Sequence, residues 1–370
     1  MLENFEELRD RSPEFFAGAN SADGFFSCFD DLYSPEKGDA FYILKGGPGT
    51  GKSTLMKRLA LAADKEGDKA ELFFCSSGPD SLDGVRFDRA LAAVADGTAP
   101  HVMDPKFPGM CERIIPLGDC LDYEKLRQKR KELLPLYNAN SALHKKASRI
   151  IRAAGSLCDD SFAVNCACVD FDRAADFGRR LCDRFLDEKQ QGRGRERRAF
   201  LSGITPAGLV VFSKTPEKMC GRVVEIEDQY GGASSAIMSV IRKRALSCGL
   251  DIITCPCALH PERKIDHVLI PEKNIAFCTV NSHIKIGSKG KKIHMGRFTN
   301  TQKMREFSAR IRFNKKASEE LFFDAAKTLA QAKNVHDQIE EHYIESMDFN
   351  RWDGFCRDVF LDLSSRVKGN

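Results

Sequence analysis

Residues 41–59 read FYILKGGPGTGKSTLMKRL, a pattern that only a few folds accommodate. The first four residues form a short apolar run that is typical of a buried strand. The glycine-rich part matches the pattern G-x-x-x-x-G-K-[ST] of phosphate-binding loops. Leu55, Met56 and Leu59 then recur at helical spacing, and Gly67 offers a stop. A strand, a loop and a helix in this order predict an α/β fold with an anion site where the helix begins.

The glycine-rich loop is the candidate nucleotide site. Glycines let the backbone N–H groups wrap round phosphates at a helix N-terminus, where the helix dipole favours an anion. We expect ATP together with Mg²⁺, with Lys52 reaching the β and γ phosphates and the Ser53 hydroxyl as a metal ligand. A strand-to-helix turn without a ligand is the alternative. The candidate cofactor-binding residues are Gly46, Gly47, Pro48, Gly49, Thr50, Gly51, Lys52, Ser53 and Thr54.

The composition indicates an ordinary soluble protein of two domains. The chain has 370 residues, of which 42% are hydrophobic and 30% charged, and its net charge is +4. This mild charge does not by itself require nucleic acid, and no apolar run is long enough to span a membrane. The 14 cysteines are scattered without a Cys-x-x-Cys pair, and the N-terminus is acidic and polar. We therefore expect a cytoplasmic protein with reduced thiols.

The second half of the chain repeats the first. Residues 223–241, VVEIEDQYGGASSAIMSVI, match the loop passage 182 residues further on. Other matches keep an offset between 178 and 184, among them Asp83-Gly84-Val85 with Asp266-His267-Val268. The four key loop positions, Gly46, Gly51, Lys52 and Ser53, become Asp228, Ala233, Ser234 and Ser235. The sequence therefore predicts a duplicated domain, divided into residues 1–192 and 193–370, with one working nucleotide site.

Each half reads as strands alternating with helices, followed by a helical tail. This order predicts two tandem P-loop NTPase-like α/β units, each with three α/β/α layers and a parallel sheet. The tails occupy residues 121–187 and about 301–366. Both a hairpin within one half and a bridge between the halves are compatible with their patterns.

A second acidic residue is expected to complete the magnesium site together with Ser53. Asp96 ends the apolar run ALAAVADG, as a carboxylate that holds Mg²⁺ at the end of a buried strand should. Alignment of the halves pairs it with Cys278, so the half that lacks the loop lysine also lacks this carboxylate. The alternative for Asp96 is a turn residue before Gly97.

The candidate catalytic residues are Lys52, Asp80 and Asp104. A carboxylate near the γ phosphate could orient a water molecule or accept a proton. Asp83 and His101 rank lower, because the second half keeps their counterparts Asp266 and His283 without the lysine of the loop.

Residues 285–316 form the most basic segment, with eleven Lys or Arg and a single acid, Glu306. Such a density of cations could contact an acidic partner or nucleic-acid phosphates. A solvated loop and helix face is the alternative interpretation.

The chain resembles a little-characterised group of bacterial P-loop ATPases that are built from two tandem P-loop halves. The likeness covers nearly the whole chain. It is carried by GGPGTGKSTLMK (46–57), CSSGPDSLDGV (75–85), DGTAPHVMDP (96–105), GITPAG (203–208) and the DF pairs at 170–171 and 348–349. The resemblance implies a tandem P-loop fold of the nucleoside triphosphate hydrolase superfamily, ATP binding and hydrolysis, and a cytoplasmic setting. The second half can carry its own P-loop in this group, and here it does not.

The sequence thus favours a Mg²⁺-dependent ATPase whose first half binds the nucleoside triphosphate and whose second half is a structural or regulatory lobe. A small-molecule or nucleotide kinase is one alternative, with the phosphoryl group passed to an acceptor near Asp80 or Asp104. A nucleotide-gated module that binds nucleic acid or protein through residues 285–316 is the other.

Overall fold

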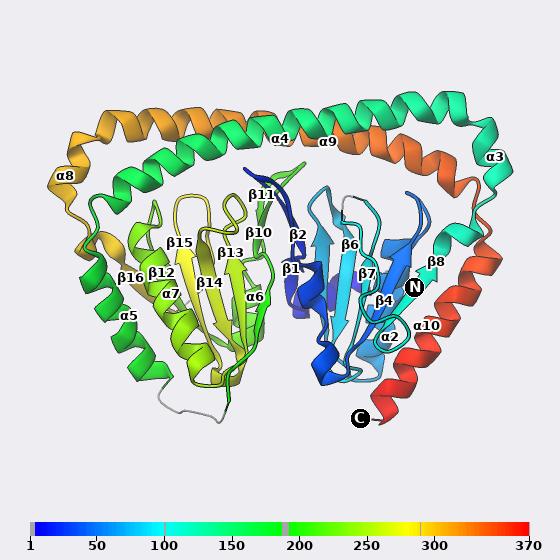
Figure 1. The fold of residues 1–370 in the computed structure, drawn as a ribbon, viewed down its shortest axis with the longest axis horizontal. Coiled ribbons are helices and arrows are strands. Elements are labelled where there is room, and N and C mark those ends of the chain that lie inside the picture. Colours follow the sequence, from blue (N-terminus) through cyan, green and yellow to red (C-terminus); the bar gives the residue numbers. More distant parts are fainter. Residues whose placement is uncertain (1–3, 100, 187–191, 289, 370) are drawn as a thin grey trace.

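Two α/β units lie side by side beneath a pair of long helices in the computed structural model (Figure 1). The structure describes residues 4–99, 101–186, 192–288 and 290–369. The two units repeat the same order of strands and of the main helices, whereas α1 and α6 occupy different places in their units. The duplication that the sequence predicts is therefore visible in the topology.

The first unit is built on a six-stranded sheet with the order β1-β5-β6-β7-β4-β8. β6 runs antiparallel to β5 and β7, whereas the other neighbours are parallel. In sheet order, the strands are β1 (Glu14–Phe16), β5 (Ala70–Cys75), β6 (Gly78–Phe87), β7 (Ala92–Asp96), β4 (Ala40–Lys45) and β8 (Glu112–Pro116).

The second unit repeats this sheet with the order β9-β13-β14-β15-β12-β16, and β14 is its antiparallel member. The strands are β9 (Glu196–Arg198), β13 (Ile252–Pro256), β14 (Ile265–Ile270), β15 (Ile275–Val280), β12 (Arg222–Glu227) and β16 (Lys291–His294). The prediction of two tandem α/β units with helical tails is confirmed. The sheets are mixed rather than wholly parallel, because β6 and β14 reverse direction.

The helices follow the same duplication. In the first half they are α1 (Phe5–Arg11), α2 (Lys52–Lys65), α3 (Tyr123–Gln128), α4 (Arg130–Cys166) and α5 (Phe171–Phe185). In the second half they are α6 (Thr215–Cys220), α7 (Gly232–Ser247), α8 (Thr301–Glu306), α9 (Ser308–Ile344) and α10 (Phe349–Gly369). Each half also has a hairpin, β2 (Gly18–Ser21) with β3 (Gly24–Ser27) and β10 (Ser202–Thr205) with β11 (Gly208–Val211).

The helical tails bridge the halves and exchange their ends. α4 and α9 have 37 residues each, about 55 Å at 1.5 Å per residue, and they pack antiparallel across both units (Figure 1). α5 then packs on α7 of the second unit, and α10 packs on α2 of the first. Each unit is therefore completed by a helix from the other half of the sequence. The division at residues 192 and 193 stays a prediction.

Short backbone ladders fasten the exchanged tails. The N–H of Asp122 donates to the Ser346 carbonyl at 2.8 Å, and the N–H of Asp348 donates to the Cys120 carbonyl at 2.7 Å. The other crossing repeats this arrangement with Asp170 to Phe298 and Asn300 to Cys168, both at 2.8 Å. The two ladders are therefore equivalent in their hydrogen bonds, although the residues that form them differ.

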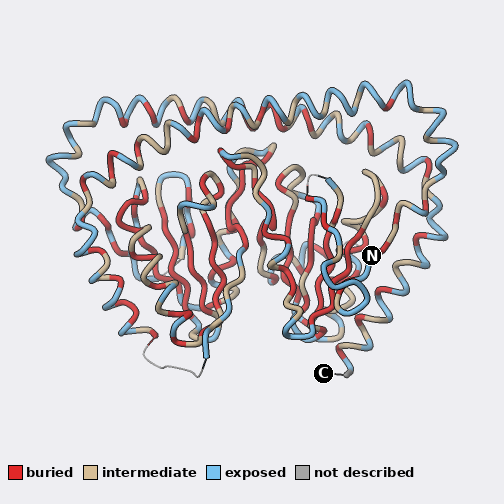
Figure 2. The backbone as a smooth tube through the Cα atoms, in the orientation of Figure 1, coloured by how far each residue is buried: buried red, intermediate tan, exposed pale blue. Residues whose placement is uncertain are grey.

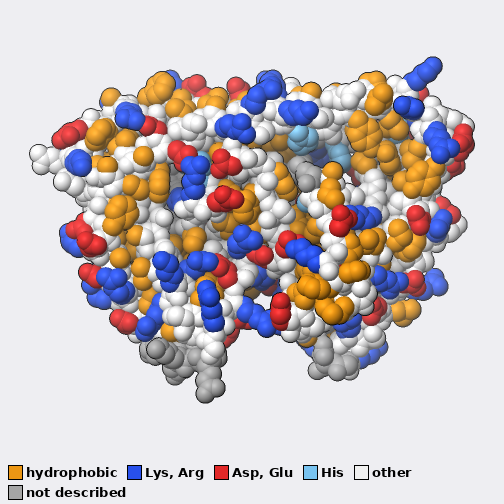
Figure 3. All heavy atoms as spheres, in the orientation of Figure 1, with side chains coloured by type: hydrophobic (Ala, Val, Ile, Leu, Met, Phe, Trp, Pro, Cys, Tyr) orange, Lys and Arg blue, Asp and Glu red, His pale blue; other side chains and the backbone are white. Residues whose placement is uncertain are grey.

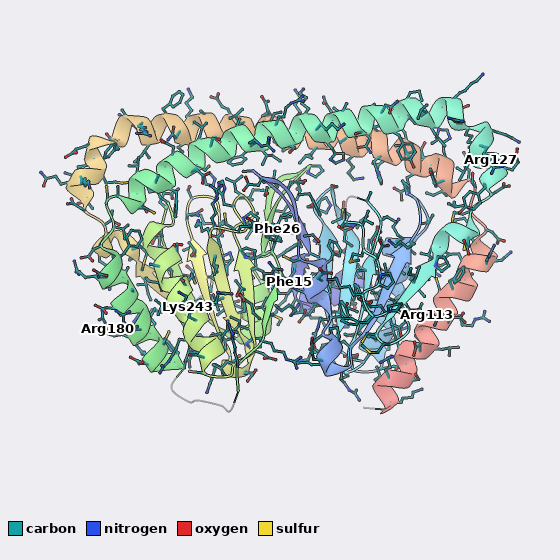
Figure 4. All side chains as sticks on the ribbon, viewed as in Figure 1. Phe15, Phe26, Arg113, Arg127, Arg180 and Lys243 are labelled. Carbon is teal, nitrogen blue, oxygen red and sulfur yellow. The ribbon has the colours of Figure 1, made fainter. Side chains whose placement is uncertain are left out.

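The two units meet at Phe16 and Phe200, which exchange two backbone hydrogen bonds of 2.8 and 2.9 Å. Phe26, labelled in Figure 4, packs edge-on against Phe200 with 6.0 Å between the ring centres. One continuous apolar core runs from the first sheet across this junction into the second, and Figure 2 shows the buried strands in both units. No helix of the described residues is long and apolar enough to cross a membrane.

We expect Leu181→Ala, on α5, to destabilise the second unit although Leu181 belongs to the first half of the sequence. Leu181 packs with Ile237 and Ile241 of α7, and burying a leucine in this way stabilises a protein by about 2–5 kcal/mol. Hydrogen exchange followed by mass spectrometry should show faster exchange in α7 and unchanged exchange in α2. The matched variant Leu59→Ala, on α2, should show the reverse. Faster exchange of α2 in Leu181→Ala would contradict the exchange of tails.

Candidate nucleotide site

The glycine-rich loop leaves β4 at the edge of the sheet that faces the long helices, and it ends where α2 begins at Lys52. Gly49 and Gly51 have φ angles of 70° and 75°, in the left-handed region that favours glycine. The Thr50 hydroxyl donates to the carbonyl of Gly47 at 2.8 Å and holds the turn closed. The loop therefore has a shape that other residues at positions 49 and 51 would strain.

Lys52 lies within the curve of the loop. Its Nζ atom donates to the carbonyl oxygens of Gly46 and Gly47 at 2.9 and 2.8 Å. The same atom lies 3.6 Å from Oδ2 of Asp96, and both side chains are largely buried, with exposed fractions of 12% and 14%. The structure thus brings together the loop lysine and the carboxylate that the sequence assigned to one site.

Three further predicted residues surround this pair. The Ser53 hydroxyl accepts a hydrogen bond of 2.9 Å from the N–H of Leu82, where β6 passes the start of α2. Thr54 lies in the first turn of α2, and Pro48 lies in the loop; both are half-buried. The predicted cofactor-binding residues are therefore continuous in space as well as in sequence.

Asp80 and Asp104 lie at the exposed margins of the loop. The backbone carbonyl of Asp80 accepts from Lys57 Nζ at 2.7 Å, and its side chain faces solvent. Asp104 is 82% exposed and forms an ion pair of 3.3 Å with Lys45. Among the described residues, Lys52 forms its ion pair with Asp96 and with neither of these carboxylates. Their catalytic role stays a prediction.

Asp83 and His101 lie much closer to Asp96. The ligating atoms of the three side chains all lie within 4.8 Å of one another, and His101 Nε2 is 3.6 Å from Asp83 Oδ2. Burial, together with the Asp96 carboxylate, raises the pKa of Asp83 to about 7. Burial lowers the pKa of His101. The second half keeps counterparts of both residues, and this retention suggested a structural role. The signal that could have revealed the cluster was the position of both residues close to Asp96 in the sequence.

Strand register corrects the counterpart of Asp96. Leu44 pairs with Asp96, and Ile226, which occupies the place of Leu44 in the second sheet, pairs with Thr279. The counterpart is therefore Thr279 and not Cys278, because the offset between the halves grows by one residue between β12 and β15. The conclusion that the second half lacks this carboxylate is unchanged.

The second loop holds an anion of its own. Oδ1 of Asp228 accepts from the N–H of Gly231 at 2.9 Å, and Oδ2 accepts from the N–H of Ser234 at 2.8 Å. The equivalent amides of the first loop belong to Gly49 and Lys52, which are expected to meet phosphate. In the second loop a carboxylate thus occupies these amides, and its charge repels any further anion.

A cavity of about 850 Å³ lies beside this second loop, between the β10–β11 hairpin and α9. The walls include Tyr230, Phe322 and Phe323, and the floor includes Lys264 and Asp266. Lys264 Nζ lies 3.0 Å from Asp266 Oδ1, and these two side chains are 16% and 1% exposed. The pair neutralises itself inside the protein, so Asp266 has a cationic partner where Asp83 has a second carboxylate.

The tail from the second half covers the outside of the first loop. A Cβ atom on Gly47 would lie 2.4 Å from the Tyr343 ring, and one on Gly49 would lie 2.7 Å from the backbone oxygen of Glu340. A Cβ atom on Gly51 would lie 2.8 Å from Trp352 Nε1. The glycines therefore serve two purposes, because they give the loop its shape and admit α9 and α10 to its surface.

The basic segment 285–316 includes β16, α8 and the first turns of α9. Several of its cations have partners, such as Lys292 with Glu225 and Arg310 with Asp160. On the face shown in Figure 3, Lys and Arg side chains are interspersed with Asp and Glu over both units.

Comparisons with known proteins give no family for this chain. No family model matches it, and neither a curated protein nor a solved structure matches it. The resemblance to tandem P-loop ATPases stays a prediction.

We expect Asp228→Ala to cost about 2 kcal/mol of unfolding free energy, because it leaves two buried amides of the second loop without their charged acceptor. Chemical denaturation measures this loss. The matched variant Glu227→Ala removes a neighbouring, half-exposed carboxylate and should change stability by less than about 1 kcal/mol. Equal effects of the two variants would contradict the account of the second loop.

We expect Asp83→Asn to stabilise the protein at pH 8 relative to the parent chain. The raised pKa means that folded Asp83 keeps its proton up to about pH 7, whereas the unfolded chain loses it near the ordinary value of 3.8. Stability from this group therefore falls as pH rises from about 4 to 7, by at most about 4 kcal/mol. Thermal unfolding in EDTA at pH 4 and pH 8 should show the gain only at pH 8, and Asp104→Asn should show none.

Proposed function

We propose that the first unit binds ATP with Mg²⁺ and hydrolyses it, and that the second unit is a lobe without a nucleotide site. The observation that carries this proposal is the contrast between the two loops. The first loop holds a lysine that faces Asp96, whereas the second loop holds the carboxylate of Asp228 on the equivalent amides. One loop is arranged for an added anion, and the other contains its own.

The residues of the first loop fit the phosphates of a nucleotide. The loop amides and Lys52 offer donors and positive charge for the β and γ phosphates. In the structure Lys52 donates to two loop carbonyls. Phosphate oxygens are stronger acceptors for an ammonium group than these neutral carbonyls are. Nucleotide binding therefore replaces two neutral contacts of Lys52 with charged ones.

The hydroxyl of Ser53 and the carboxylate of Asp96 are oxygen ligands of the kind that Mg²⁺ prefers. Bound there, Mg²⁺ would neutralise charge on the phosphates. Asp83 and His101, next to Asp96, offer a buried carboxylate and an imidazole that can accept a proton from water. This arrangement supports hydrolysis, and transfer to an acceptor hydroxyl is the alternative kinase reaction.

The single tryptophan of the chain provides a direct binding assay. Trp352 packs on Gly51 of the loop, so ATP binding should change its fluorescence. We expect Lys52→Ala to weaken the ATP-dependent change by at least about tenfold in affinity, because it removes charged hydrogen bonds to the phosphates. Ser234→Ala, at the matching position of the second loop, should bind ATP as the parent chain does.

A steady-state phosphate-release assay without any acceptor separates the two reactions. Basal release that Lys52→Ala abolishes is the expected result. If ATP were consumed only when a hydroxyl acceptor was added, the kinase reading would hold instead. Equal loss of binding in Lys52→Ala and Ser234→Ala, with both variants folded by circular dichroism, would overturn the proposal of a single site.

A further inference from the structure

We propose that Asp83, Asp96 and His101 form a binding site for a divalent transition-metal ion that fills without nucleotide. Each residue offers one ligating atom, and these atoms lie within 4.8 Å of one another. Ligand atoms at about 2.1 Å from one tetrahedral ion lie about 3.4 Å apart. Side-chain shifts on the order of an ångström therefore bring all three into contact with one ion.

The sheet itself places the two carboxylates together. β6 and β7 are antiparallel neighbours, and Gly84 pairs with Ala95. Asp83 and Asp96 directly adjoin this last pair on the two strands, and their carboxylates lie close together. Like charges directly opposite each other across two strands are destabilising. Lys52 offsets this repulsion at Asp96, and a bound dication would offset it for both carboxylates.

His101 provides the second, independent observation. The imidazole is 6% exposed, and its buried Nδ1 atom makes no hydrogen bond within the described residues. Its Nε2 atom faces Asp83 Oδ2 at 3.6 Å, beyond hydrogen-bond distance. Phe29 packs on the ring with 4.5 Å between centres, and Phe25 lies 6.0 Å away. A buried imidazole is thus held in place with Nε2 toward Asp83 and with Nδ1 lacking a partner among the described residues.

The donor set selects the class of ion. Two carboxylates and one imidazole suit Mn²⁺, Fe²⁺, Co²⁺ or Zn²⁺, because imidazole is a good ligand for transition metals and a poor one for Mg²⁺. This site is therefore distinct in chemistry from the magnesium site proposed at Ser53, although Asp96 is common to both.

The second unit shows what the same framework becomes without a metal site. Thr279 replaces Asp96, and Asp266, the counterpart of Asp83, pairs with Lys264. His283, which aligns with His101, is 45% exposed and lies 3.6 Å from Glu319. The second unit compensates its one remaining carboxylate with a lysine, whereas the first unit keeps two carboxylates beside a buried histidine.

The test is a titration of the full chain with Mn²⁺ in the absence of nucleotide, followed by electron paramagnetic resonance of the free ion. We expect one bound Mn²⁺ per chain, displaced by Zn²⁺ and retained in a hundredfold excess of Mg²⁺. His101→Gln and Asp83→Asn should each weaken binding by at least about tenfold. Two matched variants, His283→Gln and Asp104→Asn, should bind as the parent chain does.

Lys52→Ala separates this site from the nucleotide site. It should bind Mn²⁺ at least as tightly as the parent chain, because it removes a neighbouring positive charge, even though its ATP binding is weakened. The absence of stoichiometric Mn²⁺ binding would overturn the proposal whatever the ATP assays show. So would unchanged binding in His101→Gln, with folding of each variant confirmed by circular dichroism.

Discussion

The packing of α9 and α10 against the glycines of the first loop is the contact on which the rest of the structure depends. Tyr343, Glu340 and Trp352 occupy the space that side chains at positions 47, 49 and 51 would need. This contact is made by the second half of the chain on the first. In the second unit, Asn165 at the end of α4 accepts a hydrogen bond of 3.0 Å from the N–H of Gly232. Each loop is therefore held by the tail of the opposite half.

The two duplicated loops differ in what accepts hydrogen bonds from their backbone N–H groups. A ring of backbone amides at a helix N-terminus carries partial positive charge and requires an acceptor. In the second unit, Asp228 supplies that acceptor permanently, and the helix begins two positions earlier, at Gly232. In the first unit, Gly46 has no side chain to do so, and α2 begins at Lys52. The aspartate at position 228, in the place of Gly46, thus supplies from within the chain an acceptor that the first loop lacks at this position.

Sequence patterns predicted what depends on local residues. The loop, its strand and helix, and the pairing of Lys52 with Asp96 follow from spacing within a single unit. The direction of β6 cannot be predicted in this way, because a buried apolar strand has the same pattern whichever way it runs. The exchange of α5 and α10 cannot be predicted either, since the amphipathic face of a helix does not identify the helix that it packs on. Asp83 was ranked low because its counterpart survives, yet the two have opposite electrostatic environments.

α9 contacts both the cavity of the second unit and the glycine-rich loop of the first. Its first half lines the cavity of the second unit with Lys315, Phe322 and Phe323, and its last turns pack on the first loop through Glu340 and Tyr343. A continuous helix that is packed along its length against α4 moves as one body more readily than it bends. A change in the shape of the loop is consequently resisted by the packing of the opposite unit. Each unit therefore depends on helices that belong to the other half of the sequence.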